Sequence, residues 1–356
     1  LFDLLSHEGG TVDQLGDPAF FKTPLAELGT WADDPWGYPT YGIDASTTRP
    51  LEYNNGLVVD TAHAKLGISG SDADRSPERQ GTVVTGVYIE DSSVTLQQES
   101  IERGGVTGEL IRIPEMRQRT NVTSTLTSTV QRLAEGKHAR RCLDDITGPV
   151  FFDGSVYPLS VIYLTLLERA GQGAPIGNWD LPKTVITNYA AVVDACYERG
   201  LPVFGIVKTS SMGSLTESLR EKIAHNDLRG PRGTYHDVPW LRDHQFIGEV
   251  LRDTSLEHLT YTSWFVQQQV TLRGEEFALL EAVADELSHG EPHDYRRAFA
   301  YVRTPKTGNV FRIETPLLFL TDADQREQLL LKALKEIARQ GDVPRSVARA
   351  DRIARI

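Results

Sequence analysis

The sequence has 356 residues, 40% of them hydrophobic, with 37 basic and 49 acidic side chains and two cysteines. This length and composition suit a globular protein with a buried core and exclude collagen-like, coiled-coil and wholly disordered chains. Two cysteines are too few for a disulfide scaffold, and the apolar runs are too short for a membrane-spanning helix. No basic-then-apolar signal segment opens the sequence, so we expect a cytoplasmic protein with no membrane partner.

The net charge of −12 argues against a nucleic-acid partner, but positive charge is concentrated in two segments. Residues 112–141 hold seven basic and two acidic side chains, and residues 344–356 hold four basic and one acidic. Charge runs are commonly solvated helix faces, so this pattern leaves both a DNA-binding surface and an ordinary hydrated surface open.

Strand and helix patterns follow one another through the first part of the chain. Residues 1–40 are expected to be a helical or irregular segment that docks a partner. Beyond it, β-rich and fully apolar runs predict strands, and longer periodic stretches predict helices. The expected elements are strands 41–45, 56–68 and 81–90, a loop over 68–80, a helix over 123–145, a strand at 149–152, helices over 159–170 and 183–199, and a strand at 202–208.

The pattern is looser beyond residue 208, where polar, glycine-rich turns surround the expected elements. These are a helix over 239–251, an extended run over 261–272, a helix over 275–287, strands 297–303 and 309–314, and helices over 324–339 and from 344 onward. No internal repeat or low-complexity linker divides the chain. We therefore predict one α/β domain over residues 41–356, with an insertion around 211–295 that elaborates its second half.

Several common enzyme motifs are missing or lack their structural context. The sequence has no GxxxxGK[ST] phosphate loop and no GxSxG nucleophile elbow. His289 and His293 are four residues apart, but Gly290 and Pro292 between them forbid the helix that would bring both to one metal. The acidic side chains are therefore the strongest indication of a functional site in the sequence.

Two aspartates end apolar strands in nearly the same way. Asp44 follows Tyr-Gly-Ile and precedes Ala-Ser, and Asp153 follows Val-Phe-Phe and precedes Gly-Ser. A carboxylate followed by small residues at the carboxyl end of a strand lies where a cation can approach the sheet. Turn aspartates are also common at such positions, so both interpretations stay open.

Glu135 and Asp351 complete an ordered set of acids. Glu135 lies on the long helix 18 residues before Asp153, with Glu115 as the alternative, and Asp351 lies on the last helix. An Asp on the first of three antiparallel strands, a Glu on the first long helix, an Asp ending the fourth strand and an acid on the last helix form the ribonuclease-H-like order. Clustered oxygen ligands of this kind bind Mg²⁺ or Mn²⁺, which can activate water for phosphodiester hydrolysis.

Several separated blocks resemble the NurA nucleases, the partners of the HerA hexameric DNA translocase. The blocks are Gly-Ile-Asp-Ala-Ser with the strand after it, the segment from Glu135 to Asp153-Gly-Ser, Gly-Ile-Val-Lys-Thr-Ser around Lys208, the segments 301–305 and 312–316, and the closing helix. The resemblance covers residues 41–356. The sequence departs from the family pattern at Val343, where many members carry an aromatic residue, and at Asp351, where some carry His.

The resemblance implies a ribonuclease-H-like mixed sheet flanked by helices and a manganese-dependent DNA nuclease, with Mg²⁺ as the alternative ion and a two-metal site. It implies 5′-to-3′ exonuclease and endonuclease action on single- or double-stranded DNA ends, in end resection for double-strand-break repair. It also implies a homodimer docked on a HerA-like hexameric ATPase. Polarity, strand preference and a repair or phage-defence role stay open. The alternatives are an inactive DNA-binding or ATPase-docking module of the same fold and an acidic sugar-phosphate hydrolase.

Candidate site residues follow from the matching positions. We expect Asp44, Glu135, Asp153 and Asp351 to hold the metal ions and Lys208 to act beside the scissile phosphate. On the closing helix, four arginines spaced by four, three and three residues predict one basic stripe. The residues expected to contact DNA are Arg132, Lys208, Arg303, Arg349 and Arg352.

Overall fold

The fold is given by a computed structural model that describes most of the chain. The described residues are 12–25, 28, 39–69, 76–91, 93, 96, 100–113, 122–158, 181–208, 213–224, 229–230, 233–234, 238–252, 257–267, 280, 283–305, 307–340 and 343–355. No helix in this described part is long and apolar enough to cross a membrane.

The chain forms two compact units. The carboxylate unit, which holds the four predicted metal ligands, comprises Tyr38–Val203, Ala278–Glu291 and Arg345–Ile356, and the companion unit comprises Leu1–Gly37, Phe204–Phe277 and Pro292–Pro344.

The carboxylate unit is built on a mixed sheet. Three long strands form an antiparallel meander, and a later strand lies parallel to the first of them on its other side. The meander is β2 (Tyr41–Thr47), β4 (Val58–Ile68) and β5 (Gly81–Tyr88), with the short β3 (Leu51–Glu52) beside β4, and the parallel strand is β8 (Val150–Asp153). Beyond β5 lie β7 (Val106–Ile113), parallel to it, and β6 (Ser100–Arg103), antiparallel to β7.

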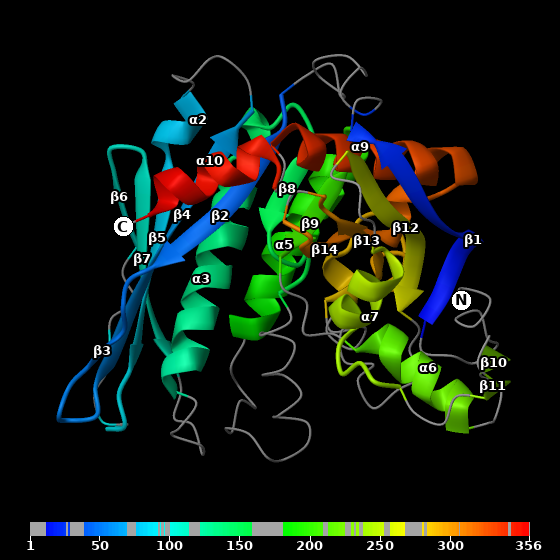
Figure 1. The fold of residues 1–356 in the computed structure, drawn as a ribbon. Coiled ribbons are helices and arrows are strands. Elements are labelled where there is room, and N and C mark those ends of the chain that lie inside the picture. Colours follow the sequence, from blue (N-terminus) through cyan, green and yellow to red (C-terminus); the bar gives the residue numbers. More distant parts are fainter. Residues whose placement is uncertain are drawn as a thin grey trace. The chain divides into compact units, whose positions relative to one another are not determined.

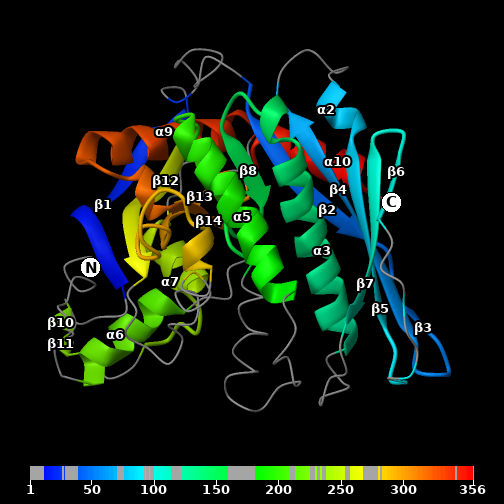
Figure 2. The ribbon, with the colours of Figure 1, turned by 180° about the vertical axis from the view of Figure 1, so that it is seen from behind.

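Helices cover both faces of this sheet (Figure 1; Figure 2). On one face α3 (Val122–Arg141) packs against β2, β4 and β5, and α5 (Leu181–Glu198) packs against α3. On the other face α10 (Arg345–Ala354) lies across β2 and β4. The short turns of the unit are α2 (Ser76–Arg79), η2 (Leu143–Asp145) and η3 (Ala284–Glu286). This arrangement confirms the predicted ribonuclease-H-like α/β class.

Two glycines let α10 approach the sheet closely. Gly42 of β2 and Gly67 of β4 are partners in the strand register. A β-carbon on Gly42 would lie 2.2 Å from the backbone carbon of Ser346, and one on Gly67 would lie 2.4 Å from the backbone nitrogen of Ala350. Because only glycine leaves this space empty, the two positions set how α10 sits on β2 and β4.

A third glycine explains an unusual position inside α3. Glycine in the middle of a helix costs about 1 kcal/mol relative to alanine. At Gly136, however, a β-carbon would lie 3.0 Å from both the Cβ of Asn188 and the Cε2 of Tyr189 on α5. The glycine is therefore needed for α5 to approach α3, and it brings Tyr189 next to the neighbouring Glu135.

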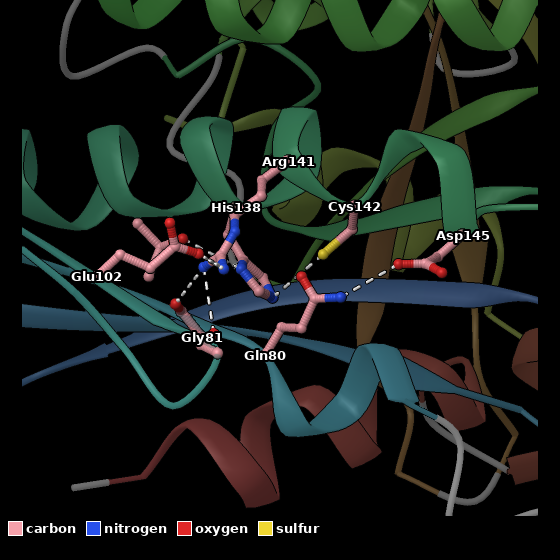
Figure 3. Close-up of polar contacts among 9 residues, drawn as sticks. Gln80, Gly81, Glu102, His138, Arg141, Cys142 and Asp145 are labelled. Carbon is pink, nitrogen blue, oxygen red and sulfur yellow. Dashed lines mark hydrogen bonds and ion pairs between the residues drawn. The ribbon is translucent and has the colours of Figure 1, made fainter.

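Polar contacts fasten the last turns of α3 to the sheet (Figure 3). Arg141 Nη1 donates to the carbonyl oxygen of Gly81 at 3.1 Å, and its Nη2 pairs with Glu102 of β6 at 2.9 Å. The buried His138 places Nε2 3.7 Å from Cys142 Sγ. Arg141 thus satisfies backbone and carboxylate acceptors within the unit.

The companion unit has an antiparallel run of strands and its own apolar core. In pairing order the strands are β1 (Val12–Pro24), β12 (His258–Gln267), β13 (Arg297–Arg303), β14 (Val310–Pro316) and β9 (Val203–Val207), whose residues from Phe204 onward belong to this unit. The remaining elements are α6 (Ser214–Ala224), β10 (Arg229–Gly230), β11 (Gly233–Thr234), α7 (Asp243–Val250), η4 (Leu317–Phe319) and α9 (Ala323–Gln340).

Buried charges in the companion unit are paired with one another. Arg297 Nη1 donates to Glu314 Oε1 at 3.0 Å, and Arg312 pairs with the same oxygen. Tyr301 donates its hydroxyl proton to Asp243 Oδ2 of α7 at 3.1 Å. A buried charge without a partner is strongly destabilising, so these pairs explain how β13 and β14 can carry charged side chains inside the unit.

The structure differs from the sequence prediction where the local pattern is weak. Within residues 1–40, expected to be helical or irregular, residues 12–24 form strand β1, which is ordered by pairing with β12. No element was expected for β6, β7 or α6, and α2 occupies part of the loop expected over 68–80. In the helix expected over 275–287, the described residues include the short turn η3, and the helix expected over 159–170 lies outside the described residues. The assignment of residues 41–356 to one domain with an insertion around 211–295 stays a prediction.

Gly42→Ala should destabilise the protein, because its methyl group would overlap the backbone of Ser346. We expect the free energy of unfolding to fall by about 2–3 kcal/mol, the upper part of the range for overpacking. Gly108→Ala is the matched control, since Gly108 also lies in a strand but a β-carbon there would meet only the Ile101 carbonyl oxygen at 3.8 Å. Urea unfolding followed by circular dichroism measures both, and equal stabilities would contradict the close approach of α10.

His138 should make the protein less stable in mild acid. Burial lowers the pKa of His138 to about 3, with further lowering by the nearby positive charges of Lys65 and Arg141. The unfolded chain takes up this proton near pH 6.5 while the folded chain does not, so stability falls as pH drops from about 6.5 towards 3. Between pH 7 and pH 5 the loss due to His138 should be about 2 kcal/mol. His138→Gln should flatten this slope in urea titrations, whereas the exposed His293→Gln should not; a slope unaltered by His138→Gln would refute the assignment.

Candidate active site

Asp44 and Asp153 lie on neighbouring parallel strands. Asp153 ends β8 as expected, but Asp44 lies within β2, which continues to Thr47 because its later residues stay paired with β4. The register pairs Ile43 with Phe152, so the next position on each strand is an aspartate. Neighbouring strands lie about 4.8 Å apart, which puts the two residues side by side on one face of the sheet. This is the face that α10 covers, because Gly42, two residues before Asp44, contacts that helix. Asp44 is 6% exposed, and Asp153 is half-buried.

Glu135 approaches Asp153 from α3. Its side chain is 1% exposed, and its charge interacts with that of Asp153. Arg132, one turn earlier on α3, donates from Nη1 to Glu135 Oε1 at 2.8 Å and to Oε2 at 2.6 Å. Tyr189 of α5 donates its hydroxyl proton to Oε2 at 2.7 Å. Both carboxylate oxygens of Glu135 therefore have partners from the protein itself.

Burial raises the pKa of Glu135 above its usual value, because desolvation disfavours the charged carboxylate. Arg132 and the hydrogen bond from Tyr189 act in the opposite direction, while the negative charge of Asp153 adds to the rise. Burial also raises the pKa of Tyr189, which keeps its hydroxyl protonated as a donor. The guanidinium of Arg132 is thus the main group that stabilises a buried, charged Glu135.

Asp351 pairs with an arginine on its own helix. Arg355, one turn later and just after the end of α10, donates from Nη2 to Asp351 Oδ2 at 2.6 Å; Asp351 is partly exposed and Arg355 is exposed. The hydrogen bond and charge of Asp351, together with the charge of Asp44, raise the pKa of Arg355. The electrostatic link between Arg355 and Asp44 indicates that α10 brings Asp351 to the same side of the sheet as Asp44.

The basic stripe expected on α10 is only partly exposed. Arg345 and Arg352 are exposed, whereas Arg349 donates from Nη2 to Glu78 Oε2 of α2 at 2.6 Å. Glu78 also accepts a hydrogen bond from the backbone nitrogen of Ile68 at 3.0 Å. Arg349 therefore fastens α10 to the end of β4, and it would have to leave Glu78 to contact DNA.

Basic side chains of α3 are also paired within the unit. Their acidic partners lie on α3 itself and on the outer strands of the sheet, so much of the positive charge of residues 112–141 is balanced internally. The pairs are Arg132 with Glu135, Lys137 with Glu109 and Arg141 with Glu102.

Two of the predicted site residues belong to the companion unit. Lys208 follows β9 directly and is exposed, and Arg303 is the last residue of β13. The expected role of Lys208 beside the scissile phosphate and the expected DNA contacts of both residues stay predictions. Glu115, the alternative to Glu135, lies outside the described residues.

The donors present suit a hard divalent cation in an open site. Among the residues that the structure describes, no group of three or more His, Cys, Asp or Glu side chains is gathered closely enough to hold one ion. Asp44 and Asp153 are adjacent, while Glu135 and Asp351 each have an arginine partner. Mg²⁺-type ions are commonly held by one or two carboxylates, with water and substrate phosphates completing the shell. Asp44 and Asp153 fit this pattern.

A family model of the NurA domain matches residues 38–356, which include every residue of the candidate site. The chain belongs to the NurA family. The NurA nuclease from Sulfolobus solfataricus aligns with 97% of this chain and 82% of its own, at 11% identity and a TM-score of 0.46. A structure of NurA bound to dAMP and manganese aligns with 97% of this chain and 86% of its own, at 11% identity and a TM-score of 0.44. No curated protein matches the sequence.

Two side chains of this NurA-family site were not identified as site residues from the sequence. In the sequence, Tyr189 is one aromatic residue within an apolar helix, which does not distinguish it from a core residue. The packing of α5 on α3 directs its hydroxyl to Glu135. Arg355 was expected in the basic stripe. Its spacing of four residues from Asp351 is a signal for a helical ion pair that could have identified the contact.

Arg349 and Arg352 should respond differently to substitution by alanine. Arg349→Ala leaves the largely buried Glu78 without its charged partner and should lower the free energy of unfolding by about 1–3 kcal/mol. Arg352→Ala, at an exposed position, should change stability by less than about 0.5 kcal/mol. It should instead weaken DNA binding and lower the slope of log affinity against log salt by about one.

Urea unfolding and fluorescence anisotropy with labelled DNA at several salt concentrations separate these effects. Weaker DNA binding by Arg349→Ala at unchanged stability would mean that Arg349 leaves Glu78 to contact DNA.

Proposed function

We propose that this protein is a divalent-metal-dependent nuclease that hydrolyses phosphodiester bonds of DNA. The observation that carries the proposal is the pair of aspartates, Asp44 and Asp153, side by side on two parallel strands, where the pairing of β2 with β8 ends, in a chain of the NurA family. Carboxylates placed in this way suit a cation that also contacts a substrate phosphate.

Each predicted ligand has a distinct task in this proposal. Asp44 and Asp153 hold the cation from β2 and β8. Asp351, on the helix that covers this face, and Glu135, whose charge interacts with that of Asp153, complete the proposed set. A bound divalent ion would activate a water molecule and stabilise the leaving oxygen. Gly154 and Ser155, directly after Asp153, leave the strand end accessible to a nucleic-acid backbone.

Two other functions account for fewer of the observations. An inactive DNA-binding or ATPase-docking module would not need two carboxylates side by side, since their mutual repulsion costs stability. A sugar-phosphate hydrolase would use similar carboxylates, but it gives no reason for exposed arginines on α10, the helix that covers the same face of the sheet.

The finer features of the function rest on family membership. We propose manganese as the preferred ion, as in the NurA structure bound to dAMP and manganese, with magnesium as the alternative and a two-metal site. We further propose 5′-to-3′ exonuclease and endonuclease action on DNA ends, in end resection for double-strand-break repair in the cytoplasm. The proposed assembly is a homodimer working with a HerA-like hexameric ATPase. Light scattering of the purified protein, alone and with such an ATPase, tests both associations, and a monomer that elutes separately from the ATPase would refute them.

Asp44→Asn and Asp153→Asn should each lower manganese-supported cleavage of end-labelled DNA by more than about 100-fold, because each removes a ligand charge at nearly constant volume. The metal-free stability of both variants should hold or rise as carboxylate repulsion is relieved. Asp144→Asn, an exposed aspartate of η2 in the same unit, is the matched control and should cleave normally. EDTA should abolish wild-type cleavage.

The same assay examines the proposed role of Lys208 beside the scissile phosphate. Lys208→Ala should lower the single-turnover rate at saturating DNA, and an unchanged rate would exclude that role. Cleavage that persists in EDTA, or normal cleavage by folded Asp44→Asn and Asp153→Asn variants, would refute the nuclease proposal at this site.

A further inference from the structure

Arg132 occupies the space in front of the Glu135 carboxylate. One guanidinium nitrogen, Nη1, lies 2.8 Å from Oε1 and 2.6 Å from Oε2, so it sits between the two oxygens. A cation bound by both oxygens of a carboxylate takes this same position. Glu135 is 1% exposed while the Arg132 side chain in front of it is 22% exposed, so Arg132 is the more accessible member of the pair.

The structure provides a specific place for this guanidinium beside Asp153. Gly154 has a φ of 134°, a conformation that favours glycine, and a β-carbon there would lie 3.3 Å from Arg132 Nη1. Arg132 therefore lies against the backbone that follows Asp153. It is at once the partner of one predicted metal ligand and the neighbour of another.

Tyr189 holds Glu135 from the opposite helix without adding charge. Its hydroxyl donates to Oε2 at 2.7 Å, and its ring lies 4.9 Å from that of Phe152, the residue before Asp153. This contact orients the carboxylate through Oε2, while Oε1 accepts from Arg132 among the side chains that the structure describes. Charge neutralisation and orientation of Glu135 are thus divided between two residues.

We propose that Arg132 is the internal counter-ion of Glu135 in the metal-free protein and that a divalent cation must displace it to use Glu135 as a ligand. The two positive groups would occupy the same space and repel each other, so the ion pair and metal coordination by Glu135 exclude one another. Arg132 then sets the metal affinity, and when displaced it becomes available beside Asp153 for a substrate phosphate. This inference rests on the proposed function, since it takes Glu135 to be a metal ligand.

Manganese binding by the DNA-free protein tests the inference without reference to cleavage. Electron paramagnetic resonance measures free Mn²⁺ in titrations of the wild type and three variants. Arg132→Gln removes the competing charge and should bind Mn²⁺ at least about tenfold more tightly. Arg132→Lys keeps a positive charge and should stay near the wild type. Tyr189→Phe removes a hydrogen bond to Glu135 but no charge, and should change the affinity by less than about threefold.

The pattern across these variants decides the outcome. Unchanged or weaker Mn²⁺ binding by folded Arg132→Gln would overturn the proposal, as would equal tightening in Arg132→Gln and Tyr189→Phe, which would indicate loosened packing instead of charge competition. Circular dichroism in EDTA checks that each variant is folded.

A crystal structure of the wild type with Mn²⁺ provides a second test that needs no variant. Glu135 should coordinate the ion and Arg132 Nη1 should lie beyond hydrogen-bonding distance of both Glu135 oxygens. An intact ion pair in the metal-bound protein would overturn the proposal. Mn²⁺-dependent DNA cleavage together with an intact ion pair would support the nuclease function and reject only the role of Arg132. No DNA cleavage together with a displaced Arg132 would support the role of Arg132 and reject the nuclease function.

Discussion

Negative charge gathered where the pairing of β2 with β8 ends is the constraint on which the carboxylate unit depends. Asp44 and Asp153 are neighbours by strand register, and Glu135 adds its charge to that of Asp153. Such a cluster is unstable unless each charge is solvated, protonated or paired. The fold uses pairing: Arg132 is paired with Glu135, and Arg355 is paired with Asp351 and is also stabilised by the charge of Asp44.

The same constraint gives the closing helix its importance. Asp351 and Arg355 lie on the same side of the sheet as Asp44 because α10 lies directly on β2 and β4, over Gly42 and Gly67. A side chain at either glycine would lift the helix and separate the C-terminal charges from the first strand. The packing of α10 on the sheet and the position of its charges therefore both depend on the close contact of α10 with Gly42 and Gly67. This contact joins residues that are about 300 positions apart in the sequence.

The sequence predicts well the features that depend on local pattern. Alternation along 56–68 and 81–90, the apolar run before Asp153 and the long periodic stretch of α3 all correspond to elements of the structure. The ribonuclease-H-like order of the acids also agrees with the parallel pairing of β2 with β8, although Asp44 lies within β2 and not at its end.

The sequence does not predict contacts between residues that come together only when the chain folds. β1 has no clear pattern of its own and is ordered by β12, and Arg349 looks like part of a basic stripe until Glu78 is seen beside it. Gly136 is a poor helix residue in the linear sequence, and only the approach of α5 explains it. In each case the deciding contact comes from a distant segment, and single-sequence patterns carry no information about it.

These partners change the meaning of the positive charge in the sequence. A run with an excess of five basic residues over 112–141 suggests an external binding surface, yet on α3 Arg132, Lys137 and Arg141 each pair with an acid of the same unit. An arginine that neutralises a buried carboxylate is unavailable to phosphate as long as the carboxylate has no other cation. Any DNA affinity of the metal-free protein must therefore come from exposed side chains such as Arg345 and Arg352, and the guanidinium of Arg132 could join them only when a metal ion has taken its place on Glu135.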